Sequence, residues 1–336
     1  MFVSFFPQLL SGPIGRGDGL LPQYKTAKHL HADNLICGGE HFIWGLFLKL
    51  VIADRAALLV DTVYNDFYSY TGLQIIFATI IYGLQIYADF DGYTHMAIGS
   101  ARMLGIRLPE NFDTPYLSSS IKEFWRRWHM SLSTWLRDYV YFSVGGSRCG
   151  RLRRYFNIML TFFVSGIWHG ASWSFVAWGL LHGFYQVIGD ILMPIRLKLC
   201  RIFKVNVEAD SFKICRMIIT FGLADFAWLF FRADGFMTAL RMCKRIIFEL
   251  HPLSLLGGSI YKLGLDEKNF RLLIYAAIVL LVTDICKYRG IDLKEKFLTQ
   301  NWLFKEIAVI IGILFIFVYG VWGNAYDAAS FIYFQF

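Results

Sequence analysis

The sequence predicts an all-α protein that crosses a membrane several times. Of its 336 residues, 56% are hydrophobic and 17% are charged, and the mean hydropathy is +0.47. Soluble chains carry about 25% charged residues, so a soluble helical protein of this composition could not cover its surface with polar groups. Several segments of membrane-spanning length also contain few or no charged side chains. These observations favour a polytopic membrane protein.

The formal net charge of +8 does not indicate binding to nucleic acid. The basic residues lie between the hydrophobic runs, where the positive-inside rule accounts for them. We therefore expect membrane lipid, and no nucleic acid, among the partners. The six cysteines include no C-x-x-C pair, so neither a metal site nor a disulfide framework is predicted.

The first third of the chain predicts one surface element and two membrane segments. Residues 1–35 are rich in glycine and proline and are expected to form a re-entrant or interfacial element. His41–Val60 is the first apolar run. The following Asp61–Gly72 contains no Lys or Arg, so it is predicted to lie outside, and Leu73–Gly99 then runs inward.

Two carboxylates, Asp89 and Asp91, lie within this inward segment. Carboxylates inside a membrane segment are functional candidates, because burying a charge there costs free energy. A depth near the membrane interface explains them equally well, so both interpretations stay open.

Residues 101–154 form the clearest cytoplasmic segment, with ten Lys or Arg against four Asp or Glu. Within it, Ile121–Tyr141 has apolar side chains at helical spacing and basic side chains between them. This pattern predicts one amphipathic helix that lies in the membrane interface.

The segment Phe156–Gly189 contains no Lys, Arg, Asp or Glu. A helix of that length would run roughly 50 Å, against a hydrocarbon core of roughly 30 Å, yet it is too short for two complete spans. We expect a hairpin broken within Ser165–Ser172, which would put His169 at depth beside non-helical backbone. Such backbone is tolerated in a membrane only where protein or a wet cavity surrounds it.

The remainder alternates basic stretches with apolar runs. A basic stretch from Arg196 to Lys213 predicts a return to the cytoplasm. The later apolar runs are Cys215–Phe231, Leu272–Ile285 and Glu306–Trp322. Residues 233–269 are expected outside, although the basic residues among them weaken that assignment.

Several motifs resemble one family of membrane enzymes. The strongest matches are Trp125-Arg126-Arg127-Trp128-His129, Gly145-Gly146-Ser147-Arg148 and Trp168-His169-Gly170-Ala171, and further patches are Phe5-Phe6-Pro7-Gln8-Leu9, Pro109-Glu110-Asn111-Phe112, Trp228-Leu229-Phe230-Phe231-Arg232 and Tyr333-Phe334-Gln335-Phe336. Together they resemble the membrane-bound O-acyltransferases, specifically the branch of alginate O-acetyltransferase membrane subunits. The patches occur in order over nearly the whole chain. The resemblance implies one membrane domain over residues 1–336, lacking the N-terminal helices usual in the family.

The resemblance implies that His169 is the principal catalytic histidine and His129 the second. A buried neutral imidazole can take the proton of an attacking hydroxyl, whereas a lone buried histidine is more often a structural residue. Further candidates for substrate binding are Trp168, Trp128, Arg126, Arg127, Asp89, Asp91 and Asp138. The arginines could bind donor phosphates or pair with lipid headgroups.

The activity implied is transfer of an acetyl group from a cytosolic thioester to an extracytoplasmic polysaccharide resembling alginate. Acetyl-CoA is the expected donor, with no bound cofactor and no metal. A periplasmic or extracellular acetyltransferase of the SGNH type is the expected partner, and the bacterial inner membrane the expected location.

Three alternatives stay open. The D-alanyl transfer proteins of teichoic-acid modification share Pro109-Glu110-Asn111-Phe112 and the Arg-Trp-His motif, although the motifs at Gly145 and Trp168 favour the acetyl branch. A transporter would use intramembrane His and Asp but predicts a second broken helix, and only one is visible. An inactive remnant is the third alternative, suggested by the missing N-terminal helices.

Overall fold

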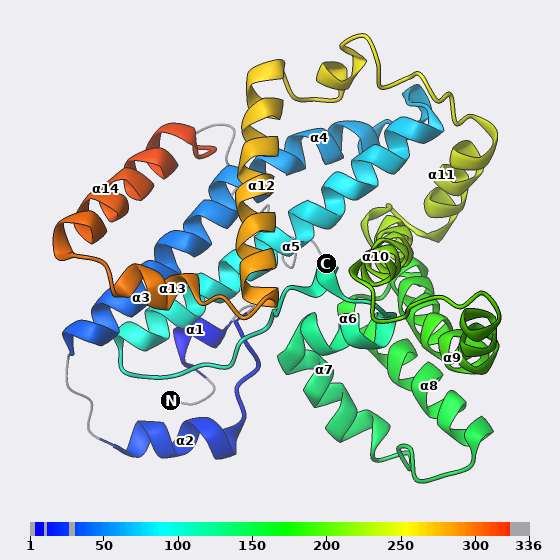
Figure 1. The fold of residues 1–336 in the computed structure, drawn as a ribbon, viewed down its shortest axis with the longest axis horizontal. Helices are drawn as coiled ribbons and strands as arrows, with labels where there is room; N and C mark the ends of the chain where they lie inside the picture. Colours follow the sequence, from blue (N-terminus) through cyan, green and yellow to red (C-terminus); the bar gives the residue numbers. More distant parts are fainter. Residues whose placement is uncertain (1–3, 10–11, 27–30, 323–336) are drawn as a thin grey trace. The chain divides into compact units, whose positions relative to one another are not determined.

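In the computed structural model, residues 4–9, 12–26 and 31–322 are described, and these residues form helices and no strands (Figure 1). The predicted all-α class is therefore confirmed. The helices are α1 (Phe6–Leu9), α2 (Gly17–Lys25), α3 (Ala32–Leu46), α4 (Asp54–Asn65), α5 (Gly72–Met103), α6 (Ile121–Arg127), α7 (Met130–Leu136), α8 (Arg151–His169), α9 (Trp173–Ile202), α10 (Asp210–Arg232), α11 (Phe236–Phe248), α12 (Glu267–Tyr288), α13 (Leu293–Leu298) and α14 (Trp302–Tyr319). The terminal patch Tyr333–Phe336 lies outside the described residues.

Five helices in the described part are long and apolar enough to cross a membrane: α5, α9, α10, α12 and α14. Each of the predicted apolar runs from Leu73 onward overlaps one of these helices. Much of the surface of α12 and α14 is apolar and exposed, as is typical of lipid-facing helices. The chain is thus a polytopic membrane protein.

The chain divides into two compact units. The first unit comprises residues 1–65, 81–113 and 255–336, and the second comprises residues 66–80 and 114–254. The implied single domain over residues 1–336 stays a prediction. Each unit has its own buried polar groups, and they are described separately below.

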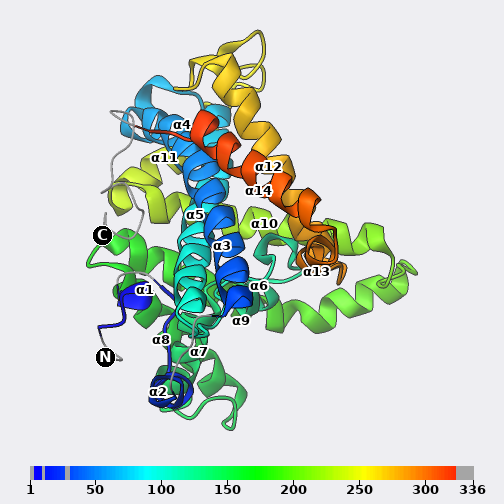
Figure 2. The same cartoon turned by 90° about the vertical axis from the view of Figure 1, so that its left-hand side faces the viewer.

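In the first unit, α3 and α5 lie side by side and run antiparallel (Figures 1 and 2). A Cβ added at Gly45 would collide with the carbonyl oxygen of Gly92, and one added at Gly38 would collide with that of Gly99. The two glycines of each helix are about two turns apart, so they occupy one face. Small residues let helix backbones approach closely in membrane proteins, and this packing is an instance.

Arg55 ties three parts of the first unit together. It is buried on α4, which continues from α3 through a π-helical segment, Phe47–Ala53. Its guanidinium donates to the carbonyl oxygens of Val51 and Tyr319, each at 2.6 Å, and to the side chain of Asn269 at 3.1 Å. Arg55 therefore satisfies a carbonyl at the end of α14 and holds the start of α12 against α4.

The second unit contains the predicted hairpin. α8 ends at His169 and α9 begins at Trp173, so the expected break is confirmed. The break is shorter than expected, because Ser165 and Gly166 remain helical. A Cβ at Gly166 would lie 2.5 Å from the carbonyl oxygen of Phe175, so this glycine serves close helix packing and not the turn.

Two further expectations differ from the structure. The single helix predicted over Ile121–Tyr141 is wrong: α6 ends at Arg127 and α7 begins at Met130, because His129 adopts left-handed backbone (φ +42°). The hairpin was expected to end near Gly189, but α9 continues to Ile202 and includes Arg196. Its basic side chains are exposed, so they extend the helix without being buried.

Candidate active site

His169 lies at the end of α8, where the helix gives way to the turn before α9. Its side chain is buried among aromatic rings. Ring centroids lie 4.9 Å from Trp168, 4.9 Å from Trp178 and 5.2 Å from Phe231, all in edge-on geometry. The imidazole is therefore fixed by packing on several sides while its backbone borders an interruption between two helices.

His129 lies between α6 and α7 and is also buried. Its left-handed backbone turns the chain, and its carbonyl oxygen accepts a hydrogen bond from the amide of Ser133 at 2.9 Å in the first turn of α7. Left-handed backbone is uncommon for a residue other than glycine and costs free energy. Such residues cluster at functional sites, where the surrounding structure holds them in place.

Both histidines contact one indole ring. The ring of Trp168 is 6.0 Å from His129 and 4.9 Å from His169, and 46% of this tryptophan is exposed. Burial, and then the neighbouring imidazole of His169, lower the pKa of His129 well below its ordinary value. His129 is therefore neutral at pH 7 and able to accept a proton.

Behind His169 lies a cluster of aromatic residues that sequence reasoning did not identify. His182 lies on α9, and its fully buried ring is 5.2 Å from Trp178 and 5.1 Å from Trp125. Neither ring nitrogen of His182 has a hydrogen-bond partner among the described residues, and the same holds for the indole nitrogens of Trp125, Trp178 and Trp228. Buried polar groups are usually paired, so this concentration of unpaired groups marks an unusual part of the core.

Two other residues of the second unit that were predicted to bind substrate, Trp128 and Arg127, make contacts within the protein. Trp128 is buried and packs on Phe124 (5.4 Å) and Trp228 (5.0 Å), so it is part of the core. Arg127 donates to Thr114 at 2.9 Å and pairs with Glu123 at 3.1 Å. The guanidinium of Arg127 therefore binds other side chains of the protein.

The remaining two charged candidates lie at the surface of α6 and just after α7. Arg126 is exposed. Asp138 pairs with its neighbour Arg137 at 2.8 Å. Because the side chain of Arg126 is exposed, its charge is available to a charged ligand or a lipid headgroup.

Asp89 and Asp91 belong to the first unit, whereas both histidines belong to the second. Asp89 is buried and pairs at 2.7 Å with Lys49, which also pairs with Asp54 at 2.9 Å. This arrangement supplies a nearby positive charge, which a buried carboxylate needs.

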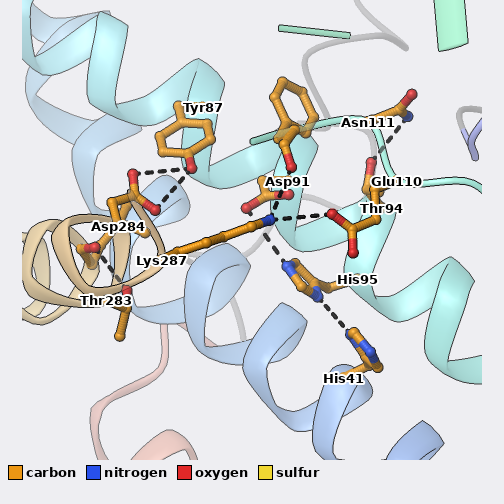
Figure 3. A network of polar contacts seen from close by, with 12 residues as sticks. His41, Tyr87, Asp91, Thr94, His95, Glu110, Asn111, Thr283, Asp284 and Lys287 are labelled. Atoms are coloured by element: carbon orange, nitrogen blue, oxygen red, sulfur yellow. Dashed lines mark hydrogen bonds and ion pairs between the residues drawn. The ribbon is translucent and has the colours of Figure 1, made fainter. Parts of the chain in front are cut away.

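Asp91 is part of a network of polar side chains within the first unit (Figure 3). Its carboxylate lies 3.7 Å from His95 Nε2, and the Nδ1 atoms of His95 and His41 are 2.8 Å apart. Because one Nδ1 must donate and the other accept, these two rings cannot both be protonated at Nδ1. The network thus joins α3 to α5 through titratable groups.

The same network fastens the loop after α5 to α12 (Figure 3). Lys287 pairs with Glu110 at 3.1 Å and donates to the carbonyl oxygen of Phe112 at 3.3 Å. Tyr87 donates to Asp284 at 3.1 Å. Pro109-Glu110-Asn111-Phe112, one of the motifs found in the sequence, therefore has a structural function here. The contribution of Lys287 could not be found from sequence, because its partners lie far away in the chain.

Within the described ranges, no three His, Cys, Asp or Glu side chains are grouped so that they could hold a metal ion. The residues around His129 and His169 are instead aromatic rings and imidazoles. They can exclude water, hold a neutral ligand by packing and exchange a proton.

Comparison with known proteins identifies the family of this chain. Residues 1–222 match the membrane-bound O-acyltransferase family. A peptidoglycan O-acetyltransferase of Helicobacter pylori is 34% identical across 100% of this chain and 64% of its own length. The probable alginate O-acetylase AlgI of Pseudomonas aeruginosa is 39% identical over 72% of this chain and 44% of its own.

A teichoic acid D-alanyltransferase of Streptococcus thermophilus is 29% identical over 73% of this chain and 63% of its own length. The chain therefore spans less than two thirds of each of these relatives. The family match covers residues 1–222 and includes both histidines of the candidate site. The chain belongs to the membrane-bound O-acyltransferase family.

Proposed function

We propose that this protein is an O-acyltransferase whose reaction takes place between His129 and His169. The observation that carries the proposal is that two buried imidazoles both contact the ring of Trp168. Family membership supports the reaction class, and acetyltransferase relatives support acetyl as the acyl group.

In the proposed reaction, a hydroxyl oxygen of the acceptor attacks the carbonyl carbon of an acyl thioester. The neutral imidazole of His169 accepts the hydroxyl proton as the carbon–oxygen bond forms. The carbon–sulfur bond then breaks, and the proton passes to the departing thiolate, which leaves as a thiol. No charge or atom is left over.

Trp168 has two functions in this proposal. Its exposed ring provides a surface at the opening of the site, and its packing against both imidazoles keeps water from them. The indole N–H is also a donor that can stabilise the developing oxyanion. His129 holds the donor side of the site, consistent with its position in the basic segment predicted to be cytoplasmic.

The donor we propose is a cytosolic thioester, acetyl-CoA, and the acceptor is an extracytoplasmic polysaccharide. Relatives named for peptidoglycan and for alginate both support a glycan acceptor. We further propose a periplasmic or extracellular acetyltransferase of the SGNH type as partner, and the bacterial inner membrane as the location. Arg126 is the candidate for contact with donor phosphates, because its side chain is exposed.

A purified-protein assay tests the proposal. The protein in proteoliposomes is supplied with acetyl-CoA labelled in the acetyl group, and thiol release is followed with a soluble glycan acceptor. We expect His169→Ala to reduce thiol release at least 100-fold, since general base catalysis contributes about 10²–10⁴-fold.

The matched control is His251→Ala. His251 is exposed and also has left-handed backbone (φ +42°), so this variant removes a histidine from the same backbone conformation outside the site. It should release thiol at the wild-type rate. Undiminished release by His169→Ala would refute the proposal.

D-alanyl transfer to a teichoic acid is the second candidate. The teichoic acid D-alanyltransferase of Streptococcus thermophilus matches 73% of the chain at 29% identity, below the 39% of the alginate relative. Replacing acetyl-CoA in the same assay by a D-alanyl thioester on a carrier protein distinguishes the two donors.

A further inference from the structure

A cavity of about 400 Å³ lies within the first unit, separate from the two histidines. It is formed where the end of α5 and the following loop meet α2 and the start of α3. The lining residues are Gln23, Asn34, Arg102, Gly105, Ile106 and Arg107.

Two arginines give the cavity a positive charge, and no acidic side chain among its described lining residues neutralises it. Arg102 and Arg107 both line it, and none of the described residues that line it is acidic. The Nε atom of Arg102 is buried and has no hydrogen-bond partner among the described residues. A buried guanidinium donor without an acceptor is costly, so an acceptor from outside the chain is expected there.

The wall of the cavity is held in a fixed shape. The side-chain amide of Gln23 accepts from the backbone amide of Arg107 at 2.9 Å and donates to its carbonyl oxygen at 3.1 Å. This pair of hydrogen bonds fastens the loop after α5 to α2. The guanidinium of Arg107 is thus presented from a backbone that is already positioned, which lowers the entropy cost of binding.

We propose that this cavity binds a phosphate group carried by a lipid headgroup or by a soluble molecule. Two guanidiniums and the amide of Asn34 provide several donors, which suits an anion with several oxygens. Bare phosphate would leave much of the volume empty, so the ligand carries a further group. The site lies at the basic end of α5, in the segment predicted to be cytoplasmic. It does not depend on the proposed acyl transfer.

The test uses the full chain purified in detergent and follows its thermal unfolding. One arm adds sodium phosphate against sodium chloride of equal ionic strength. The other adds phosphatidylglycerol against diacylglycerol with the same acyl chains, which lacks the phosphate. Stabilisation by phosphate would indicate a soluble ligand, and stabilisation by phosphatidylglycerol alone would indicate a lipid headgroup.

In either arm, Arg102→Gln with Arg107→Gln should abolish the stabilisation, and each single change should weaken binding about tenfold. The matched control is Arg196→Gln with Arg201→Gln, which removes the same charge from exposed positions on α9. That control should bind as the wild type does.

Arg107→Gln keeps the experiment decisive if the double variant fails to fold, because the Arg107 side chain is exposed and its backbone contacts remain. The proposal is overturned if neither phosphate nor phosphatidylglycerol stabilises the protein. It is also overturned if Arg107→Gln binds as tightly as the wild type.

Discussion

His129 combines a buried side chain with a backbone conformation that few residues adopt. Glycine, asparagine and aspartate tolerate left-handed backbone best, whereas β-branched residues tolerate it worst. The chain has a histidine at this position, so the strain is offset by what surrounds it. The apolar side chains continue at helical spacing across this position, so the sequence predicts one continuous helix there.

We predict that His129→Asn folds and loses activity, whereas His129→Val does not fold well. Asparagine keeps the left-handed backbone, while valine adds roughly 1–3 kcal/mol of strain at a buried position. Thermal unfolding of the two purified variants measures the difference.

His251→Asn and His251→Val form the control pair, because His251 has the same backbone conformation and an exposed side chain. If His129→Asn lost as much stability as His129→Val, backbone strain would not explain the difference.

The start of helix α6 depends on a cluster of side-chain hydrogen bonds. The hydroxyl of Ser120 accepts from the amide of Glu123 at 3.2 Å, and the Glu123 carboxylate accepts from the amide and hydroxyl of Ser119 at 2.9 and 2.8 Å. Arg127 pairs with the same carboxylate. This is a helix N-cap extended by an ion pair, and it positions the segment that ends in His129.

The pH dependence of stability tests this cap. Burial raises the pKa of Glu123, but the hydrogen bonds from Ser119 and the charge of Arg127 outweigh it, so the net pKa is lowered. A carboxyl whose folded pKa is lowered stabilises the protein above its unfolded pKa, about 4.3, and this contribution is lost as the pH falls through the folded pKa.

We therefore predict that Glu123→Gln lowers the free energy of unfolding by about 1 kcal/mol at pH 7. The difference from wild type should shrink steadily as the pH is lowered from 5 to 3. Denaturant unfolding of both proteins at each pH provides the measurement. A difference that stayed constant over this range would show that the carboxylate charge is not responsible.

Features that depend on a contiguous stretch of sequence can be predicted from the sequence. Features that depend on contacts between distant residues cannot. The hairpin of α8 and α9 follows from the length of an uncharged run, so His169 was correctly expected beside non-helical backbone. The packing of α3 on α5 depends on Gly45 meeting Gly92, and nothing near either glycine indicates its partner.

The candidate site was predictable to a similar extent. His129 and His169 were found through motifs, and their shared contact with Trp168 emerged only from the fold. The sequence singles out Asp89 and Asp91 as intramembrane carboxylates, yet Lys49, the charge partner of Asp89, comes from a distant segment of the chain. Tertiary packing decides which partner lies beside a buried charge, so this partner cannot be identified from one sequence.

As a whole molecule, the chain is a polytopic membrane protein made of two compact units, each with its own set of buried polar groups. The second unit contains the two histidines and the aromatic cluster. The first unit contains the carboxylate network and the arginine-lined cavity. Catalysis is proposed for one unit and phosphate binding for the other, so variants in either unit can be tested separately.

The most direct test of the central claim is the acetate bound to polysaccharide in cells that express the wild type, His169→Ala, His129→Ala or His251→Ala, with the membrane level of each protein measured. We predict that both site variants lose polysaccharide-bound acetate at an unchanged protein level and that His251→Ala retains it. Wild-type amounts of acetate in cells that depend on His169→Ala would contradict the proposal that acyl transfer takes place between these two histidines.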